Sequence, residues 1–232
     1  MIQGRIATSL KWERLIYEWL TDKSNSNQNL ESKTNFAKTT FQSESTSLNA
    51  VGISNPSLRK KVLEARTMSC YFLSKYKKHV DKTLFNHINS VWIDLIDHWT
   101  LSDHLCIDAF ANLDLNQISY TKEIKKWVKN ENFWRRRLSV TIYLKHLRKH
   151  EWAGLLALEN IDKLKEDTNY YVRKSFSWVL RESSKVMKEN ISAYLINNVG
   201  YFNKTELHEA SKYCDQGFKT ELLDTYDQLK IS

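Results

Sequence analysis

The chain contains the stretch Arg137-Leu-Ser-Val-Thr-Ile-Tyr-Leu144, with which three other segments align when their first strongly polar helix position is superposed. These segments are Arg66-Thr-Met-Ser-Cys-Tyr-Phe-Leu73, Asp103-His-Leu-Cys-Ile-Asp-Ala-Phe110 and Lys174-Ser-Phe-Ser-Trp-Val-Leu-Arg181. In chain order the four segments begin at Arg66, Asp103, Arg137 and Lys174, so their first residues are spaced by 37, 34 and 37 positions. A weaker fifth copy follows 37 positions later at Ser211. Repetition at a period near 36 residues indicates an array of helical repeats.

Separate amphipathic helices are expected between the aligned segments, because apolar residues recur there at helical spacing. They cover Lys82–Trp99, Tyr120–Lys129, Trp152–Leu164 and Met187–Asn198. Each unit is therefore a predicted helical hairpin, and stacked hairpins bury a continuous core. The chain has one Pro and five Gly, fewer turn residues than a β-rich fold needs. The sequence predicts an all-α fold, an α-solenoid, as a single domain over residues 1–232.

The N-terminal part differs in composition from the repeats. Residues 5–21 form a predicted amphipathic helix, and residues 22–50 are a polar loop or weakly ordered segment, with a short helix around 36–41. A turn is expected at Gly52-Ile-Ser-Asn-Pro56. We find neither the apolar core of a signal peptide nor a run near the roughly 18 apolar residues of a membrane span.

The chain has 35 Lys and Arg against 27 Asp and Glu, a formal net charge of +8. This excess suggests a polyanionic partner, with nucleic acid favoured over an acidic membrane surface, although a merely soluble basic protein is the alternative. Its three cysteines, Cys70, Cys106 and Cys214, are odd in number and widely separated. They argue against a disulfide framework and fit a reducing cytosol, so a cytoplasmic location is expected.

Equivalent positions of a solenoid form a row across its inner face, and the alignment puts Arg66, Asp103, Arg137 and Lys174 in that row. Spaced basic groups suit the phosphates of a DNA duplex, whereas a solvated helix face is the alternative for each of them. Aromatic residues lie one turn from these positions and share their helix face. They are Trp99, Trp134, Tyr171 and Trp178, of which Trp134 and Tyr171 fit a place in the repeat core equally well.

The acidic member of the row, Asp103, indicates a catalytic role for this surface. A carboxylate on a basic surface repels the DNA backbone, which is costly unless the carboxylate has a task. Departure of a base leaves an oxocarbenium-like sugar, which a carboxylate stabilises, and an Asp can orient the attacking water. Purines alkylated at N3 or N7 are cationic and leave readily, so a lone Asp flanked by aromatic residues suffices.

At these residues the sequence resembles the AlkD-type family of HEAT-like alkylpurine DNA glycosylases, from about residue 50 to the C-terminus. The matching stretches are Gly52-Ile-Ser-Asn-Pro-Ser-Leu-Arg59, Glu64-Ala-Arg66, Trp99-Thr-Leu-Ser-Asp103-His-Leu-Cys106, Asn132-Phe-Trp-Arg-Arg-Arg137 and Tyr171-Val-Arg-Lys-Ser-Phe-Ser-Trp178-Val-Leu-Arg181. The stretch between Pro56 and Glu64 is shorter than in the family, as though most of a helical hairpin were missing.

The resemblance implies base excision repair of alkylated purines in duplex DNA by a DNA glycosylase, with the damaged base left in the duplex. It implies Asp103 as the catalytic aspartate, Trp99 and Trp178 packing against the deoxyribose, and Arg137 contacting the backbone near the lesion. Further DNA contacts are expected from Arg66, Arg136, Lys174, Arg181, Tyr171 and Trp134. We expect HEAT-like repeats, a monomer, no cofactor, no metal and no membrane partner.

Several alternatives stay open. Trp92-Ile-Asp94-Leu-Ile-Asp97 is a second tryptophan–aspartate pattern, although Asp97 does not fit the repeat spacing. A DNA-structure-binding protein without excision activity would keep the basic row and not need Asp103. A protein-interaction scaffold would have an apolar or mixed-charge inner face instead. A metal site of His98, Asp103, His104 and Cys106 matches no zinc spacing.

Overall fold

The structure, a computed structural model, describes residues 56–75 and 81–231. The predicted helix over residues 5–21, the polar segment 22–50 with its short helix, and most of the turn before Pro56 lie outside the described residues. All described residues belong to one compact unit.

The described residues are helical and contain no strand, which confirms the predicted all-α fold. The α-helices are α3 (Pro56–Lys75), α4 (Lys82–His87), α5 (Trp99–His104), α6 (Ile118–Trp127), α7 (Phe133–Thr141), α8 (Glu151–Leu164), α9 (Tyr170–Ser183), α10 (Lys188–Asn197), α11 (Lys204–Ala210) and α12 (Gln216–Ile231). Short π and 3-10 segments join some of them, namely η3 (Ile88–Trp92), η4 (Ile93–Leu95), η5 (Leu105–Ala109) and η6 (Val199–Tyr201).

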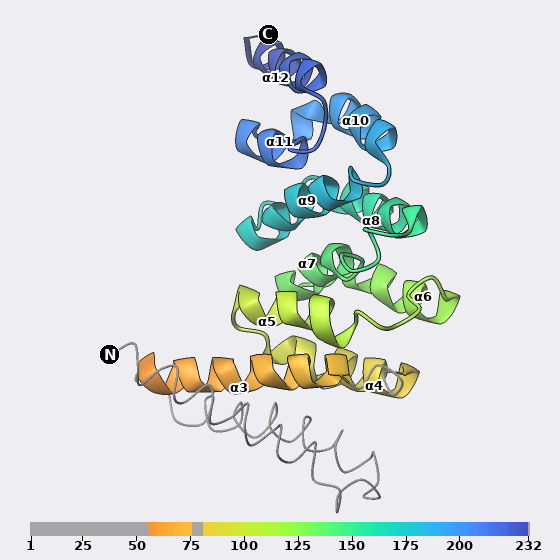
Figure 1. Cartoon of the computed structure of the whole chain (residues 1–232). Coiled ribbons are helices and arrows are strands. Elements are labelled where there is room, and N and C mark those ends of the chain that lie inside the picture. Colours follow the sequence, from red (N-terminus) through yellow and green to blue (C-terminus); the bar gives the residue numbers. More distant parts are fainter. Residues whose placement is uncertain (1–55, 76–80, 232) are drawn as a thin grey trace, which may run out of the picture. The chain divides into compact units, whose positions relative to one another are not determined.

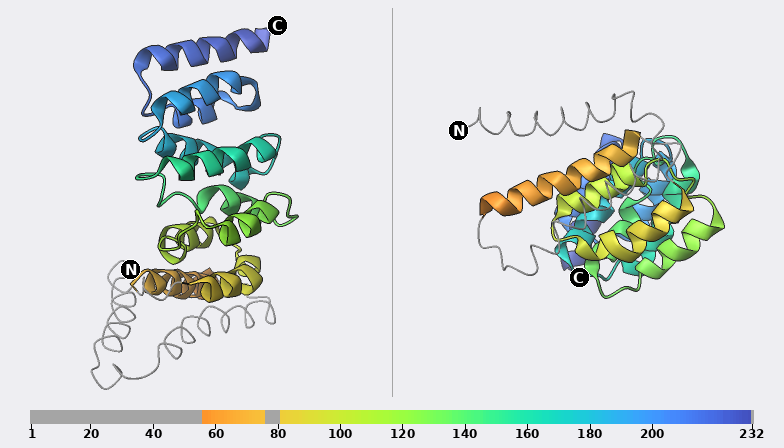
Figure 2. Two further views of the ribbon diagram at one scale, coloured as in Figure 1. Left: turned by 90° about the vertical axis from the view of Figure 1, so that its right-hand side faces the viewer. Right: turned by 90° about the horizontal axis from the view of Figure 1, so that it is seen from below.

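One helix of each unit packs against its counterpart in the next unit. Helix α3 contacts α5, α5 contacts α7, α7 contacts α9, and α9 contacts α11. The partner helices α6, α8 and α10 pack beside this series, and the helices follow one another in chain order (Figures 1 and 2). This arrangement is consistent with an α-solenoid. No helix among the described residues has both the length and the apolar character needed to cross a bilayer.

The starts of α5, α7, α9 and α11 show the repeat register. Each helix is capped by a side chain that accepts a hydrogen bond from a backbone N–H of the first turn. The capping residues are His98, Asn132, Asn169 and Asn203. Asp103, Arg137 and Lys174 each lie five residues after their cap, as the sequence alignment requires. The fifth copy is different, because five residues after Asn203 is His208, whereas the expected Ser211 is the buried C-cap of α11.

The helix predicted over Lys82–Trp99 is shorter than expected. It passes from α4 through η3 and η4 and ends at Leu95, after which Ile96 takes an extended conformation with ψ of 120°. His98 is also extended, and its Nδ1 accepts the N–H of Thr100 at 3.2 Å. This cap begins a new helix at Trp99, so Trp99 and Asp103 share α5 and lie one turn apart.

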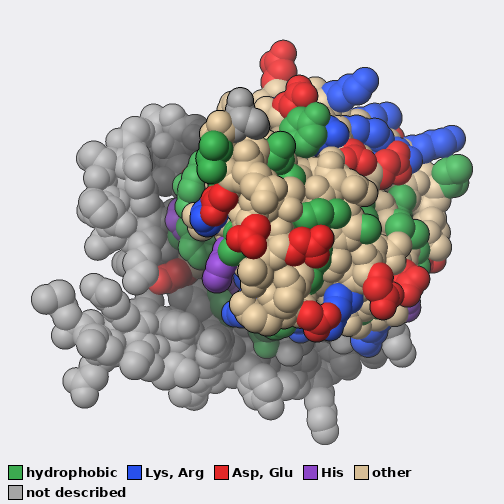
Figure 3. All heavy atoms as spheres, turned by 90° about the horizontal axis from the view of Figure 1, so that it is seen from above, with side chains coloured by type: hydrophobic (Ala, Val, Ile, Leu, Met, Phe, Trp, Pro, Cys, Tyr) green, Lys and Arg blue, Asp and Glu red, His purple; other side chains and the backbone are tan. Residues whose placement is uncertain are grey.

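Apolar side chains from both helices of each unit form the core. The largest fully buried side chains include Trp92, Tyr143, Phe85, Phe110 and Phe176. All three cysteines are buried and unpaired. Most of the charged side chains lie at the surface, and the face at the C-terminal end carries Lys and Arg gathered on one side with acidic groups among them (Figure 3).

Candidate active site at the Asp103–Arg137 ion pair

Arg137 connects three consecutive helices of the stack. Its Nη2 donates to Asp103 Oδ1 at 2.6 Å, which joins α7 to α5. Its Nη1 donates to the backbone carbonyl of Tyr171 at 2.7 Å, and its guanidinium carbon lies 5.9 Å from the ring centroid of Trp178, both on α9. The structure therefore brings together Asp103, Arg137 and Trp178, which are far apart in the sequence.

The ion pair is largely buried but incompletely hydrogen-bonded. The side chains of Asp103 and Arg137 are 14% and 5% exposed. Among the described residues, Asp103 Oδ2 accepts no hydrogen bond, and the buried Nε of Arg137 has no partner. Burial raises the pKa of Asp103, and the positive charge of Arg137 opposes this shift. One carboxylate oxygen is thus held by a cation while the other remains available to a ligand.

A tryptophan lies beside each partner of this ion pair. Trp99 begins α5, one turn before Asp103, and is 48% exposed. Its ring centroid lies 5.3 Å from that of His98, the residue that caps the same helix. Trp178, which is half-buried, approaches from α9 on the side of Arg137. A large exposed aromatic ring beside a half-open carboxylate is suited to packing against a sugar or a base.

The alternative carboxylates upstream have different surroundings. Both oxygens of Asp94 are bound by Arg135, through Nε and Nη2 at 2.9 Å each. These bonds lower the pKa of Asp94. The Asp97 side chain is 67% exposed and lies 3.6 Å from Arg66. Asp94 is thus occupied by a fork of hydrogen bonds and Asp97 is largely in solvent, whereas Asp103 is both sheltered and half open.

The predicted DNA-contacting arginines are mostly engaged within the protein. Arg66 is buried, donates to the carbonyl of Leu95 and pairs with Asp97. Arg136 pairs with Asp167 at 2.6 Å, and Arg181 pairs with Glu209 at 2.9 Å. Lys174 is the most accessible member of the predicted row, with 42% of its side chain exposed and Glu209 4.0 Å away.

The aromatic residues Trp134 and Tyr171 pack against one another. Their ring centroids are 5.0 Å apart, and the Phe133 ring lies 4.6 Å from Trp134. Trp134 is 6% exposed. This packing supports the repeat-core interpretation of Trp134, whereas Tyr171 serves the site through its backbone carbonyl. DNA contacts by either side chain stay predictions.

Sequence reasoning missed the residues that organise the site without belonging to the basic row. Arg135 holds Asp94, Arg173 holds Glu206, and His98 caps the helix of the candidate site. A repeated pattern in the sequence would have located two of these helix starts. Asn132 is followed four residues later by Arg136, and Asn169 is followed four residues later by Arg173. Within the part of the chain that the structure describes, no cluster of His, Cys, Asp and Glu could hold a metal ion.

Comparison with known proteins gives a family. The family model described as "DNA alkylation repair enzyme" matches residues 29–214, a span that includes the helices α3 to α11 and every residue of the candidate site. No curated protein matches the chain in a sequence search. Because the family match covers most of the sequence, the chain belongs to the DNA alkylation repair enzyme family.

Proposed function

We propose that the protein is a DNA glycosylase that hydrolyses the N-glycosidic bond of N3- or N7-alkylated purines in duplex DNA. The observation that carries this proposal is the half-open carboxylate of Asp103, bound through one oxygen by Arg137 and flanked by the exposed Trp99. Membership of the alkylation repair family supports a DNA substrate. HEAT-like repeats, a monomeric state, the absence of a cofactor and a cytoplasmic location belong to the same proposal.

The chemistry follows from the charge of the lesion. When the bond from C1′ of the deoxyribose to the base nitrogen breaks, both bonding electrons leave with the cationic base, which becomes neutral. The sugar becomes oxocarbenium-like, and Asp103 stabilises the positive charge more strongly in its sheltered position than it would in water. Water then adds to C1′ and loses a proton, with Oδ2 of Asp103 as the acceptor that orients it. No general acid is needed for a leaving group of this kind.

Arg137 acts in this scheme as a positioning residue for Asp103. Its positive charge keeps the carboxylate ionised against the effect of burial. Its second bond, to the Tyr171 carbonyl, ties the pair to α9 and so to Trp178. The phosphate contact that the family resemblance implies for Arg137 would require a local movement, because its guanidinium is buried and already serves two partners.

The release of free base from methylated duplex DNA tests the proposal directly. The wild-type protein should release 7-methylguanine or 3-methyladenine, and Asp103→Asn should reduce the rate about 100-fold or more. DNA affinity should be retained or increased, because the substitution removes a charge that repels phosphates. Release is measured under single-turnover conditions, so that binding and chemistry are separated.

Asp94→Asn is the matched control, since it makes the same chemical change nine residues away at a carboxylate already held by Arg135. It should retain release. If the wild-type protein releases no base above a buffer control, the proposal fails in favour of a DNA-structure-binding protein. If Asp103→Asn is as active as the wild-type protein, Asp103 is not the catalytic group.

A further inference from the structure

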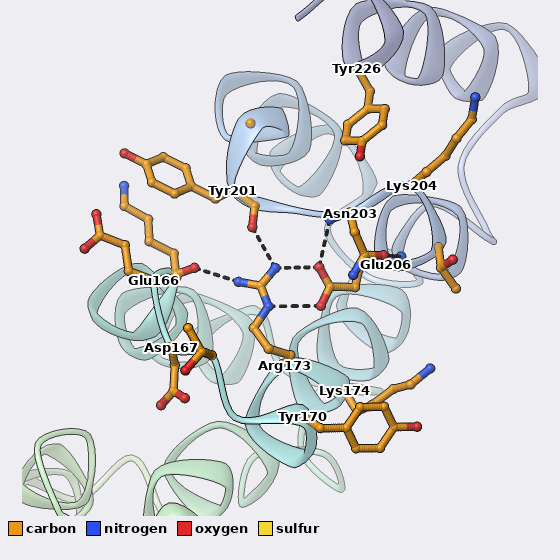
Figure 4. A pocket seen from close by; sticks show the side chains of 14 residues that line it. Glu166, Asp167, Tyr170, Arg173, Lys174, Tyr201, Asn203, Lys204, Glu206 and Tyr226 are labelled. Carbon is orange, nitrogen blue, oxygen red and sulfur yellow. Dashed lines mark hydrogen bonds and ion pairs between the residues drawn. The ribbon is translucent and has the colours of Figure 1, made fainter. Parts of the chain in front are cut away.

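A groove lies at the N-terminal ends of α9 and α11, one repeat beyond the candidate active site (Figure 4). Its volume is about 980 Å³, and α12 contributes Tyr226 to its wall. Three tyrosines and three lysines line it, together with acidic and small polar side chains and Arg173. The tyrosines and lysines are Tyr170, Tyr201, Tyr226, Lys165, Lys174 and Lys204.

The floor of this groove is the ion pair of Arg173 and Glu206, and it is fully satisfied. Arg173 donates to both oxygens of Glu206 (Figure 4). It also donates to the backbone carbonyls of Lys165 and Tyr201, and these two bonds are each 2.6 Å long. Glu206 also accepts the backbone N–H of Asn203. The floor thus holds the two helix starts together and presents no net charge to a ligand.

The positive charge on the walls comes from three lysines, two of which have only partly exposed acidic partners. Asp167 pairs with Arg136 and Glu206 pairs with Arg173, so Glu166 is the acidic lining residue that has no cation partner among the described residues. Of the three lysines that line the groove, Lys165 has no acidic partner within the described residues, and its Nζ lies 4.2 Å from the centre of the Tyr201 ring. Lys204 pairs with Asp227, and Lys174 lies 4.0 Å from Glu209.

The two lysine pairs are weak competitors for a phosphate. The Lys204 and Asp227 side chains are 55% and 50% exposed, and Lys174 is 42% exposed. Exposed pairs of this kind contribute only about 0–1 kcal/mol, so a phosphate oxygen can replace their carboxylates. The tyrosines complete the surface, because Tyr170 and Tyr201 are 64% and 43% exposed. Lysines interleaved with exposed tyrosines are typical of a surface that holds a nucleic-acid backbone.

The groove is connected to the candidate active site through consecutive residues. The Tyr170 ring lies 5.4 Å from that of Tyr171, and the Tyr171 carbonyl is the second partner of Arg137. We propose that this groove binds the phosphodiester backbone of the duplex flanking the alkylated base, with Lys165, Lys174 and Lys204 on phosphates and the tyrosines against the sugars. The assignment rests on the proposed function, in that DNA is held at Asp103.

The test is the salt dependence of binding to undamaged duplex DNA by the double variant Lys165→Ala/Lys204→Ala. Each lost phosphate contact makes the slope of log K against log salt less steep by about 0.9. Two lost contacts reduce the slope by about 1.8, so between 50 and 200 mM salt the wild-type protein should lose roughly tenfold more affinity than the variant.

The control is Lys145→Ala/Lys149→Ala, which removes two exposed lysines without acidic partners in the described residues, on the connection after α7. Its slope should equal that of the wild-type protein. A groove variant with a wild-type slope overturns the assignment, and so does a control variant that changes the slope equally, because any surface lysine would then act alike.

Base release separates a failure of the groove from a failure of the proposed function. With saturating methylated duplex, the groove variant should release base at the wild-type rate, because Asp103 and its neighbours are untouched. A slower rate at saturation contradicts the assignment of the groove to binding alone. If the wild-type protein releases no base while the slopes differ as expected, the groove stands as a DNA-binding site and the glycosylase proposal falls.

Discussion

The Arg173–Glu206 and Arg137–Asp103 pairs each join neighbouring repeats, and they are built differently. Arg173 binds Glu206 side-on, through Nε and Nη2. Its Nη1 and Nη2 also donate to backbone carbonyls, so each nitrogen of the guanidinium has an acceptor. Arg137 binds Asp103 end-on, through Nη2 alone, and within the described residues its own Nε and the Oδ2 of Asp103 have no hydrogen-bond partner. The Arg135–Asp94 pair follows the side-on arrangement of Arg173.

The difference separates pairs that hold the fold from a pair that can react. A guanidinium fork engages both oxygens of a carboxylate and fixes their orientation, which leaves less lone-pair capacity for water or a sugar cation. A buried donor or acceptor without a partner costs free energy, and such groups persist where they have a function. On this criterion Glu206 and Asp94 are structural, whereas Asp103 is available for chemistry.

Removing the two arginines should therefore have unequal effects on stability. Arg173→Ala should cost about 3–5 kcal/mol, because Glu206, 7% exposed, is left without its cation and two backbone carbonyls lose their donor. Arg137→Ala should cost less, because Asp103 already has a raised pKa and can take up a proton when its partner is lost. Urea unfolding of both variants measures the difference.

The activities should show the opposite order. Arg137→Ala should lose base release together with the charge of Asp103, whereas Arg173→Ala should retain it at saturating DNA at temperatures where the variant is folded. Equal losses of stability, or a larger loss for Arg137→Ala, would contradict the distinction between the two pairs.

The two kinds of pair should also respond oppositely to pH. Burial raises the folded-state pKa of Asp103 above 3.8, whereas Arg135 lowers that of Asp94 below 3.8. Asp94 therefore contributes stability that is present above its unfolded pKa and is lost as the pH falls through the lowered folded value. Asp103 has the reverse sign, since the folded state binds its proton more tightly and gains stability as the pH falls through the raised value.

Base release should follow the ionisation of Asp103. We expect an acid limb above pH 3.8 on which the rate falls about tenfold for each pH unit. Single-turnover release between about pH 4 and 8, corrected for spontaneous depurination, measures this limb. Asp94→Asn should leave the limb in place. An acid limb at or below the ordinary pKa of an aspartate would show that Asp103 is not sheltered as the structure indicates.

The helical fold and the row of repeat positions could be predicted because both follow from local spacing. Asp103, Arg137 and Lys174 lie five residues after their helix caps, so aligning polar positions at 34 and 37 residues finds equivalent places in space. The fifth repeat was misaligned by three residues, because Ser211 is polar but buried at the end of α11, and polarity alone does not distinguish a surface position from a cap.

The engagement of the basic residues could not be predicted from the sequence. A net charge of +8 counts Arg66 and Arg136 as available cations, yet the structure pairs them with Asp97 and Asp167, 31 residues away in each case. Which arginine meets which carboxylate depends on how one helix packs on the next, and residue spacing carries no such information. The same holds for the end-on geometry of Arg137, which distinguishes Asp103 from Asp94.

His98 offers the finest test of the site, because it does two things that can be separated. Its Nδ1 caps α5, and its ring lies 5.3 Å from that of Trp99. The other three caps of the series, Asn132, Asn169 and Asn203, are asparagines, which cap a helix without an aromatic ring. His98→Ala should lose about 1 kcal/mol of stability through the missing cap, and His98→Asn should recover most of it.

Loss of the contact between the His98 and Trp99 rings should change the rate of base release and leave the stability unchanged. If His98 fixes the orientation of Trp99 over the sugar, His98→Asn should fold as stably as the wild-type protein and still release base roughly two- to tenfold more slowly, the range of an aromatic pair. The rate at saturating DNA and the DNA affinity are measured together with urea unfolding. Full recovery of the rate in His98→Asn would mean that His98 acts as a cap and nothing more. In that case α5 alone would orient the exposed Trp99 ring, and Arg137 of α7 would remain the residue that orients Asp103.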